Sequence, residues 1–345
     1  MNPLVTVLIP TFNYAHYLPE SVASVAQQTF RDFEVVVVDD GSVDDTAAVV
    51  AGLECPNLRY VRHEQNRGLP AARNTGLAIA RGRYVALLDA DDVMKPSNLA
   101  RKVEVLERHR DVALVHGPVE PMDDRGRPLG RTRANGHEEI RIENLFPKIL
   151  HGNLIACSSV LARKEAIDEL GGFDPRLRYA EDWDLWVRLS HRFKFAYLPE
   201  PLVRYRIHVA SMQWGAWKGG DDLAAGERTL KKVFAELELE REGFSFERLY
   251  WELYFRRVGN QAENLPFRSF ARLFFSGALR SPRLALGSLG LKAGLKLLAR
   301  ALIPRSVLLR WRLRRYVRRL TGDRREITER LRRSRSGQMV ARPER

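Results

Sequence analysis

Residues 84–92 read Tyr-Val-Ala-Leu-Leu-Asp-Ala-Asp-Asp, an apolar run that leads directly into three carboxylates. A short apolar run of this kind predicts a strand, Tyr84 to Leu88, buried in a sheet. In open α/β sheets, ligands bind outside the carboxyl ends of the strands. The turn from Asp89 to Asp92 is therefore predicted to lie in a functional site held by the sheet.

Strands and helices are predicted to alternate before this turn. The strands are expected at 5–9, 33–38 and 58–62, and the helices at 17–28, 44–53 and 69–80. The second strand contains four consecutive valines, Val35 to Val38, which is typical of a parallel strand covered on both faces. Alternation at this spacing predicts an α/β protein with a doubly wound sheet.

The pattern changes towards the C-terminus. From 112 to 210 it is mixed, with strands near 112–116, 155–162 and 202–206 and helices near 143–151, 164–170 and 181–191. Beyond 211 the pattern predicts helices and no strand. We therefore expect an α/β domain over 1–210, a helical basic region over 211–335 and a disordered tail over 336–345.

The net charge of +14 is unevenly distributed along the chain. Residues 1–210 hold 27 Lys and Arg against 29 Asp and Glu, whereas residues 211–345 hold 30 against 14. An even distribution would have favoured a nucleic-acid binder with a basic face. The observed one predicts a neutral globular domain followed by a cationic appendage.

The cysteines and the N-terminus bear on the cellular compartment. Cys55 and Cys157 are far apart and form no C-x-x-C pattern, which favours a reducing compartment and neither a disulfide framework nor a thiolate metal site. No basic segment precedes an apolar stretch at the N-terminus, so we expect no secretion signal. These features predict a cytoplasmic protein.

The three carboxylates at 89–92 have a specific chemical use. Asp89, Asp91 and Asp92 would repel one another on a short turn unless a cation lies between them. Hard oxygen ligands with open positions suit Mg²⁺ or Mn²⁺ carrying a diphosphate. The alternative is an acidic turn that only caps the helix beginning near Pro96.

A second acidic cluster, Asp39-Asp40-Gly41-Ser42, follows the valine-rich strand. One of its carboxylates can accept the N–H of a pyrimidine ring, although the same residues could form a plain turn and helix cap. The phosphates of a nucleotide need a metal and a cation, for which Arg73 is the candidate. Otherwise Arg73 would be a solvated residue on a helix face.

Five motifs in this order resemble glycosyltransferase family 2, whose members have the GT-A fold. The similarity covers about residues 3–210 and consists of Val-Leu-Ile-Pro-Thr-Phe-Asn at 7–13, Asp-Asp-Gly-Ser at 39–42, Gly-Leu-Pro-Ala-Ala-Arg-Asn at 68–74, Leu-Asp-Ala-Asp-Asp at 88–92 and Ala-Glu-Asp-Trp-Asp-Leu-Trp at 180–186. Each motif alone is weakly specific, but the ordered set is strong. The resemblance implies a GT-A nucleotide-binding α/β/α sandwich with a C-terminal helical, basic extension.

The resemblance also implies roles for individual residues. The implied donor-binding residues are Pro10, Thr11 and Phe12 around the base, Asp40 as an acceptor from the base, Asp89 near the ribose, and Glu181 as the first member of the family's acidic pair. Asp91 would bind the metal, and His208 would lie near the diphosphate or the metal. Asp182, the second member of the acidic pair, would be the catalytic base.

The chemistry of sugar transfer agrees with this set of residues. Transfer with inversion needs one carboxylate to take the proton of the attacking hydroxyl. The leaving diphosphate needs its charge neutralised by a metal, whereas a glycosidase would need a second carboxylic acid to protonate the leaving group. Asp182 could otherwise be a plain acid at a helix N-terminus. Trp183 could pack in the core or stack on a sugar.

Three other functions would require different sequence features. A sugar nucleotidyltransferase would carry a Gly-rich loop with a basic residue after the first strand, where this chain has Pro10-Thr11-Phe12-Asn13. A dinucleotide oxidoreductase would need G-x-G-x-x-G at that place. A non-enzymatic nucleic-acid binder would use the basic C-terminal half, and we expect no nucleic-acid partner.

The C-terminal region has an amphipathic pattern. A helix is predicted over 284–303, with Leu291 and Leu295 on one face and Lys292 on another, and Pro304 ends it. Residues 305–335 hold 13 Lys and Arg against 3 Asp and Glu. Such a segment suits the surface of an anionic membrane, but it is too charged to span one. The alternative is ordinary packing on the first domain with a solvated basic face.

We therefore expect an inverting glycosyltransferase that uses a nucleoside diphosphate sugar and Mg²⁺ or Mn²⁺. UDP or dTDP fits best, because a carboxylate can accept the ring N–H of uracil or thymine. The expected acceptor is a glycan or a lipid-linked molecule in cell-envelope polysaccharide or lipid-linked glycan synthesis. The expected location is the cytoplasm, peripheral on the inner face of the cell membrane.

Overall fold

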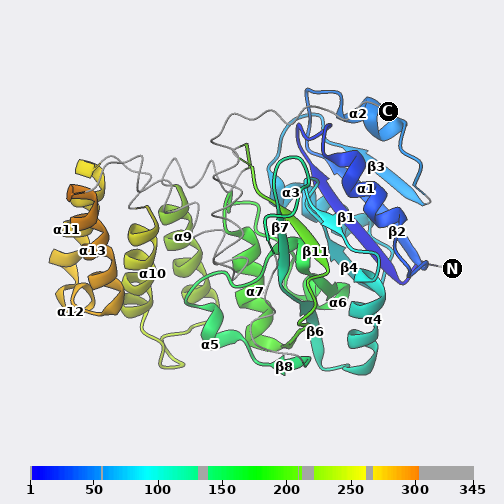
Figure 1. The fold of residues 1–345 in the computed structure, drawn as a ribbon. Coiled ribbons are helices and arrows are strands. Elements are labelled where there is room, and N and C mark those ends of the chain that lie inside the picture. Colours follow the sequence, from blue (N-terminus) through cyan, green and yellow to red (C-terminus); the bar gives the residue numbers. More distant parts are fainter. Residues whose placement is uncertain are drawn as a thin grey trace.

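The computed structural model describes residues 2–55, 57–130, 139–208, 210–211, 221–261 and 267–302. Its centre is an eight-stranded sheet in the order β3-β2-β1-β4-β9-β6-β10-β8, and the predicted α/β class is confirmed (Figure 1). The strands of this sheet are β1 (Val5–Thr11), β2 (Phe33–Asp39), β3 (Leu58–Arg62), β4 (Tyr84–Leu87), β6 (Val112–His116), β8 (Arg141–Glu143), β9 (Leu161–Arg163) and β10 (Lys194–Tyr197). A smaller sheet has the order β5-β11-β7 and consists of β5 (Val93–Met94), β7 (Val119–Met122) and β11 (Val203–Arg206).

Helices surround the large sheet and continue beyond it. They are α1 (Leu18–Ala26), α2 (Thr46–Ala51), α3 (Leu69–Ile79), α4 (Asn98–Arg108), α5 (Phe146–Ile149), α6 (Lys164–Glu169), α7 (Glu181–Arg192), α9 (Asp221–Glu236), α10 (Phe246–Gln261), α11 (Phe267–Arg280), α12 (Pro282–Ala285) and α13 (Ser288–Leu302). A 3₁₀ turn covers Cys157–Ser159. In the residues that the structure describes, no strand follows β11, as the C-terminal pattern predicted.

The valine run shows why the sheet is covered on both faces. Val36 and Val38 pack in a buried cluster that includes Ala72 of α3, whereas Val35 and Val37 pack in another cluster beneath α1 and α4. Successive strand residues point to opposite faces, so a strand with two packed faces must be apolar throughout. β1, β2, β3 and β4 run parallel, which brings their carboxyl ends to one edge.

Some predicted boundaries are wrong for identifiable reasons. β1 continues through Pro10 to Thr11, because the pairing with β4 ends at Leu8 and a proline is tolerated where one side of a strand is unpaired. The predicted helix at 143–151 is only α5, since β8 pairs with β10 and the Asn144 side chain accepts the Phe146 N–H at the start of the helix.

Two further segments differ from their prediction. The predicted strand at 155–162 is a 3₁₀ turn followed by β9, which pairs antiparallel with both β4 and β6. The helix predicted over 284–303 is divided into α12 and α13. A Cβ on Gly290 would lie 2.1 Å from the Ala285 carbonyl oxygen, so the two helices meet at close backbone contact. Residues 305–335 and 336–345 lie outside the described residues.

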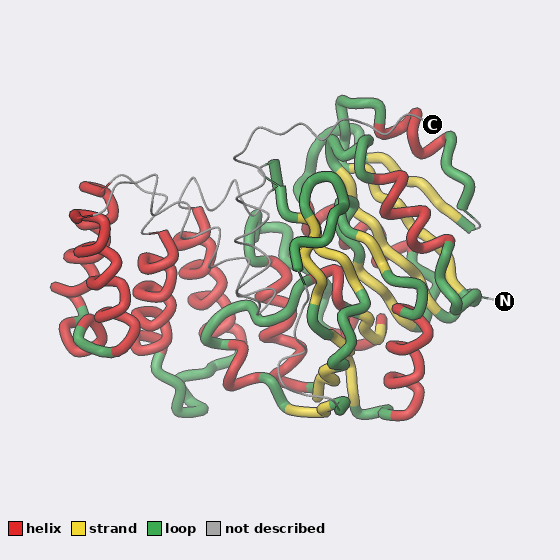
Figure 2. Tube along the Cα trace, viewed as in Figure 1, coloured by secondary structure: helices red, strands yellow, loops and turns green. Residues whose placement is uncertain are grey.

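The C-terminal helices extend from the sheet domain in a row (Figure 2). α9 packs on α7, α10 packs on α9, and α11 to α13 pack on α10 and on one another. Leu230 of α9 and Leu249 of α10 belong to the same buried cluster as Trp186 of α7. The domain division at 211 stays a prediction, but α9 and α10 share the core of the sheet domain. None of the described helices combines the length and apolarity that a membrane crossing needs.

Candidate active site

The loops after β1 and β2 are joined by side chains. The Asn13 N–H donates to Ser42 Oγ at 2.9 Å, and the Val43 N–H donates to Asn13 Oδ1 at 2.8 Å. Pro10 and Thr11 are buried, whereas Phe12, in the loop after β1, is 42% exposed. Of the three residues predicted to line a base pocket, Phe12 is the one that presents its side chain to solvent.

Asp40 lies beneath the loop that leads into α3. Its carboxylate accepts the N–H groups of Arg67 and Gly68 at 2.9 and 2.8 Å, and it contacts His63 Nδ1 at 2.7 Å. Only 3% of Asp40 is exposed. A carboxylate offers about four acceptor positions, and these contacts use three of them, so Asp40 mainly organises this loop and has about one acceptor position unused.

The acidic turn after β4 is held by residues distant in the sequence. The Asp89 N–H donates to Ser158 Oγ at 3.0 Å, and Asp92 Oδ1 accepts the Arg206 N–H at 2.8 Å. Asp92 is buried, and its pKa is raised well above the usual value by burial and by Asp91 and Asp89. Asp92 therefore anchors the turn to β11, while Asp89 and Asp91 remain partly exposed.

His208 and Asp91 come together, as a shared role near a metal requires. His208 Nε2 lies 2.9 Å from Asp91 Oδ2, and the His208 ring packs against Tyr14 and Tyr17. Arg206 also fixes this turn, because its Nε donates to the Asp91 carbonyl at 2.7 Å. An oxygen and an imidazole donor side by side suit a divalent cation.

A metal at this place would need ligands from the substrate. Within the described ranges, no group of three or more His, Cys, Asp and Glu side chains could hold a metal by itself. Mg²⁺ and similar ions are commonly bound by one or two carboxylates together with substrate phosphates and water. The pair Asp91 and His208 fits that arrangement.

Arg73 joins the acidic turn to the acidic pair of α7. Its guanidinium is 2% exposed, donates to Asp89 Oδ1 at 2.8 Å and to Glu181 Oε1 at 2.7 Å, and lies 5.2 Å from the centre of the Phe173 ring. The alternative of a solvated Arg73 is therefore wrong. Arg73, which was predicted to bind the phosphates, is already paired with two carboxylates.

Glu181 and Asp182 open α7 under different constraints. Glu181 is buried and ion-paired, and burial raises its pKa to about 7 although Arg73 opposes the rise. Asp182 is partly exposed and accepts the Asn153 amide at 2.8 Å through Oδ2. Burial raises the pKa of Asp182, while Arg73 and the Asn153 hydrogen bond lower it.

The backbone before α7 is strained where the pair begins. Ala180 has φ 61° and ψ 23°, a left-handed conformation that costs a non-glycine residue about 1–2 kcal/mol. The conformation puts both acids in the first turn of α7, where the helix dipole favours negative charge. Strain of this kind is found at sites where geometry is functionally constrained.

Asn153 is a site residue that the sequence motifs did not identify. It lies in the loop between α5 and the 3₁₀ turn, 29 residues before Asp182. No motif surrounds it, because its role depends on a contact between two segments. A polar residue directly after a glycine, at the start of an irregular stretch, would have been the only signal.

Comparison with known proteins decides the family. The family model described as glycosyl transferase family 2 matches residues 6–171. An uncharacterized glycosyltransferase from Methanocaldococcus jannaschii is 30% identical over 214 residues, covering 60% of this chain and 71% of that protein. An uncharacterized glycosyltransferase from Nostoc sp. is 32% identical over 224 residues, covering 61% and 67%. The chain belongs to glycosyltransferase family 2.

Solved structures show the fold of this family 2 enzyme independently. S. aureus TarS residues 1–349 in complex with UDP-GlcNAc has a TM-score of 0.55 at 20% identity, covering 78% of this chain and 83% of that one. The mannosyltransferase PcManGT from Pyrobaculum calidifontis, in complex with GDP-Man and Mn²⁺, has a TM-score of 0.52 at 20% identity, covering 86% and 88%. These similarities confirm the predicted GT-A fold.

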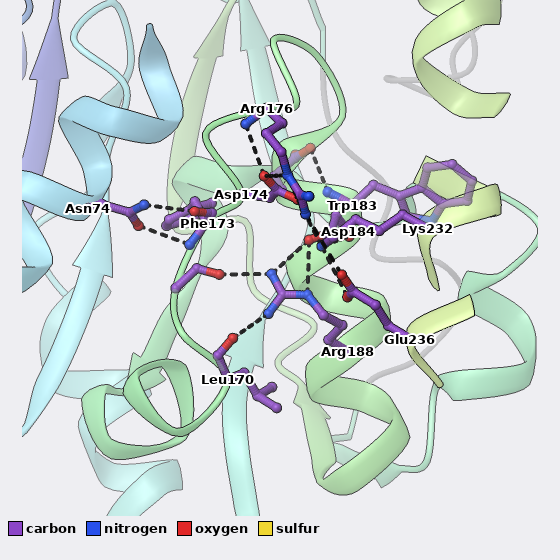
Figure 3. Close-up of polar contacts among 12 residues, drawn as sticks. Asn74, Leu170, Phe173, Asp174, Arg176, Trp183, Asp184, Arg188, Lys232 and Glu236 are labelled. Atoms are coloured by element: carbon purple, nitrogen blue, oxygen red, sulfur yellow. Dashed lines mark hydrogen bonds and ion pairs between the residues drawn. The ribbon is translucent and has the colours of Figure 1, made fainter. Parts of the chain in front are cut away.

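In this glycosyltransferase, a network of charged side chains holds α7 in place (Figure 3). Asp184 is fully buried and binds Arg188 at 2.7 Å and Lys232 of α9 at 2.7 Å. Lys232 also lies 3.3 Å from Asp174. The sheet domain and the first C-terminal helix are thus joined at the helix that carries Glu181 and Asp182.

A second connection in Figure 3 joins α3 to the loop before α7. The Asn74 side chain, next to Arg73, donates to the Phe173 carbonyl at 2.7 Å and accepts the Phe173 N–H at 2.9 Å. Trp183 is 1% exposed and donates its indole N–H to the Ile149 carbonyl at 2.7 Å. Trp183 is therefore a core residue, and the alternative of stacking on a sugar is wrong.

Proposed function

We propose that the enzyme moves a sugar with inversion from a nucleoside diphosphate sugar to an acceptor hydroxyl, with Asp182 as the general base. The observation that carries the proposal is the pair of contacts from Arg73 to Asp89 and Glu181. They bring the acidic turn after β4 and the first turn of α7 to opposite sides of one buried guanidinium. A donor sugar bound at the turn would then lie within reach of α7.

The contacts of the acidic pair favour Asp182 over Glu181 as the base. Glu181 is buried and held by Arg73, so its carboxylate has little freedom to meet an acceptor. Asp182 is partly exposed, and its Oδ1 and Oδ2 each accept a single hydrogen bond, from the Trp183 N–H and from Asn153. Each oxygen therefore keeps an acceptor position for the hydroxyl proton.

Asp91 and His208 would hold a divalent cation, Mg²⁺ or Mn²⁺. When bound, such a cation neutralises the charge that develops on the leaving diphosphate. The mannosyltransferase PcManGT, which shares this fold, is in complex with both GDP-Man and Mn²⁺, and this supports a metal role here. Tyr14 and Tyr17 pack on the His208 ring and keep it oriented towards Asp91.

The donor would bind across the ends of β1, β2 and β4. Phe12 offers an exposed ring to the base, Pro10 and Thr11 set the floor of the loop, and Asp40 has an acceptor position for a ring N–H. Uracil or thymine provides that N–H, so UDP or dTDP is the proposed carrier. We assign Arg73 a donor role through Asp89, whose carboxylate it orients towards the ribose.

The acceptor is proposed to be a growing glycan or a lipid-linked molecule, in cell-envelope polysaccharide or lipid-linked glycan synthesis at the inner face of the membrane. Family membership and the basic C-terminal half support this choice, and a fold alone would not. We also propose that residues 1–210 form the catalytic domain and residues 211–335 a helical region.

A thermal-unfolding screen tests the proposed donor. The full-length enzyme is heated with UDP-, dTDP- and GDP-sugars, each with Mn²⁺ and with a chelator. A ligand at 100 times its Kd stabilises the folded state by about 2.7 kcal/mol. We expect a rise in Tm with a UDP- or dTDP-sugar only when the metal is present. Stabilisation by GDP-sugars alone would contradict the assignment of uracil or thymine as the nucleotide base. Equal stabilisation with the chelator would contradict the metal assignment.

A further inference from the structure

The outermost helices, α11 to α13, carry an unusual concentration of exposed apolar side chains. These helices and the turn between α12 and α13 hold six of the ten large hydrophobic residues that are exposed in the described part of the chain: Phe267, Phe275, Leu279, Leu286, Leu291 and Leu295. Leu279 is 83% exposed and Leu286 is 74% exposed. Exposed apolar side chains gathered in one place commonly mark an interaction surface.

Four of these side chains, Phe275, Leu279, Leu291 and Leu295, lie on the exposed faces of α11 and α13, whereas Leu286 lies in the turn between α12 and α13. On α11, Arg268, Arg272, Phe275 and Leu279 are exposed at spacings of four, three and four residues, which places them on one face. The opposite side of α11 packs through Phe270 against Val258 of α10 and Leu297 of α13.

On α13, Leu291 and Leu295 share a face by a spacing of four residues, and the exposed Lys292 lies on the neighbouring face. Ala293 and Leu297 are buried. α11 and α13 contact each other and α10, and they form the end of the row of helices that is farthest from the sheet (Figure 1). We name the exposed residues of α11 to α13 the outer face.

The charge of the outer face has one sign. Residues 267–302 contain seven Lys and Arg and no Asp or Glu, and Arg268, Arg272, Arg280, Arg283 and Lys292 are exposed. None of these five forms an ion pair with a carboxylate in the residues described. On α9 and in the loop before α10, by contrast, Lys231 pairs with Glu227 and Arg241 pairs with Glu238.

We infer that the outer face docks the enzyme on the surface of a bilayer that contains anionic lipids. Leucine and phenylalanine side chains would enter the boundary between headgroups and acyl chains, and the arginines around them would contact anionic headgroups. This inference rests on the part of the proposed function that puts the acceptor at a membrane. It does not depend on the donor or on the catalytic base.

Charge and chemistry separate this occupant from the others. A second copy of the same face would be equally cationic. Residues 303–345 of the chain hold 15 Lys and Arg against 4 Asp and Glu, so they too would be repelled. A nucleic acid would match the cations but would leave the leucines and phenylalanines in water. An anionic bilayer matches both the charge and the apolar side chains.

The test is co-sedimentation of the full-length protein with vesicles. Two pairs of exposed residues are changed: Leu279→Ser with Leu291→Ser, and Arg272→Ala with Lys292→Ala. The control removes two paired cations elsewhere, Lys231→Ala with Arg241→Ala. Vesicles of phosphatidylcholine with phosphatidylglycerol are compared with pure phosphatidylcholine, at low and at high salt.

We expect tight binding to the anionic vesicles, weaker binding at high salt and little binding to the neutral ones. Removing two cations should weaken binding by roughly 30-fold, because each contributes about 1 kcal/mol near an anionic surface. The serine pair should weaken it comparably, and the control pair should bind as the wild type does. Donor binding measured by calorimetry should be unchanged in all variants, so failure of the vesicle test is distinct from failure of the proposed function.

Several results would overturn the inference. Equal binding to both vesicle types, or wild-type binding by both variant pairs, would exclude this face. If duplex DNA displaces the protein from vesicles and the serine pair binds DNA normally, the surface serves nucleic acid. If the wild type is a dimer in the absence of vesicles, and the serine pair is a monomer that does not bind vesicles, a second copy of the chain covers the outer face. If maleimide does not react with the Leu279→Cys variant in the absence of vesicles, another part of the chain covers the outer face.

Discussion

Arg73 on α3 and Glu181 on α7 are 108 residues apart in the sequence, and their side chains form a buried ion pair of 2.7 Å. The same guanidinium binds Asp89 at 2.8 Å. One buried cation therefore sets the distance between the acidic turn after β4 and α7, the helix that carries the proposed base.

Arg73→Met should destabilise the enzyme strongly. Removing one partner of a buried ion pair leaves an uncompensated charge and costs about 3–5 kcal/mol. Urea denaturation measures the loss. Arg83→Met is the control, because its pair with Glu107 is exposed and should contribute at most about 1 kcal/mol. Similar losses for the two variants would mean that Arg73 does not hold the site together.

Asp91→Ala should abolish Mn²⁺-dependent binding of a nucleoside diphosphate while the protein remains folded. The change removes the oxygen donor beside His208 and should leave little metal-dependent affinity. Calorimetry with and without Mn²⁺ measures this, and Asp124→Ala on an exposed turn is the control. Unchanged metal-dependent affinity in Asp91→Ala would refute the metal role.

Asn153→Ala should change the pH dependence of turnover. As the proposed base, Asp182 would act only when it is deprotonated, so kcat should fall as the pH falls through its pKa. Burial raises this pKa and the Asn153 hydrogen bond lowers it. Losing the bond should raise the pKa and move the acidic limb of the kcat profile to higher pH. Asn144→Ala, in the neighbouring loop, should leave the limb in place. A uniform fall in kcat with no shift would indicate a purely structural role for Asn153.

Lys232→Met tests whether α9 is part of the same folded unit as α7. Asp184 is fully buried and would keep only Arg188 as a partner. Losing a hydrogen bond to a charged group costs about 1.5–3 kcal/mol. Lys231→Met changes the exposed neighbour and should alter stability by less than about 0.5 kcal/mol. Equal unfolding midpoints for the two variants would show that the Lys232 contacts do not stabilise the fold.

The sheet and the acidic turns were predictable because their signals are local. Four valines in succession predict a strand buried on both faces, and Asp-rich turns after such strands predict a site at the carboxyl edge. The division of 155–162 into a turn and β9 was not predictable, because that strand exists through its pairing with β4 and β6.

Side-chain partners between distant segments were beyond the reach of sequence motifs. Arg73 reads as either a phosphate ligand or a surface residue until its two carboxylate partners are known. Asn153 belongs to no motif, and its contact with Asp182 depends on how a loop packs against α7. Asp40 was predicted to be an acceptor, but its three internal partners emerge only from the folded loop.

The turnover number of Asp182→Asn tests the central claim most directly. Asparagine keeps the shape of the side chain but cannot take a proton from the acceptor hydroxyl. With the donor sugar identified by the thermal screen, we expect kcat to fall by roughly two to four orders of magnitude, while the Kd of the donor measured by calorimetry stays within about threefold of the wild type. Near-normal kcat in this variant would contradict the account and move the base elsewhere, with Glu181 as the next candidate.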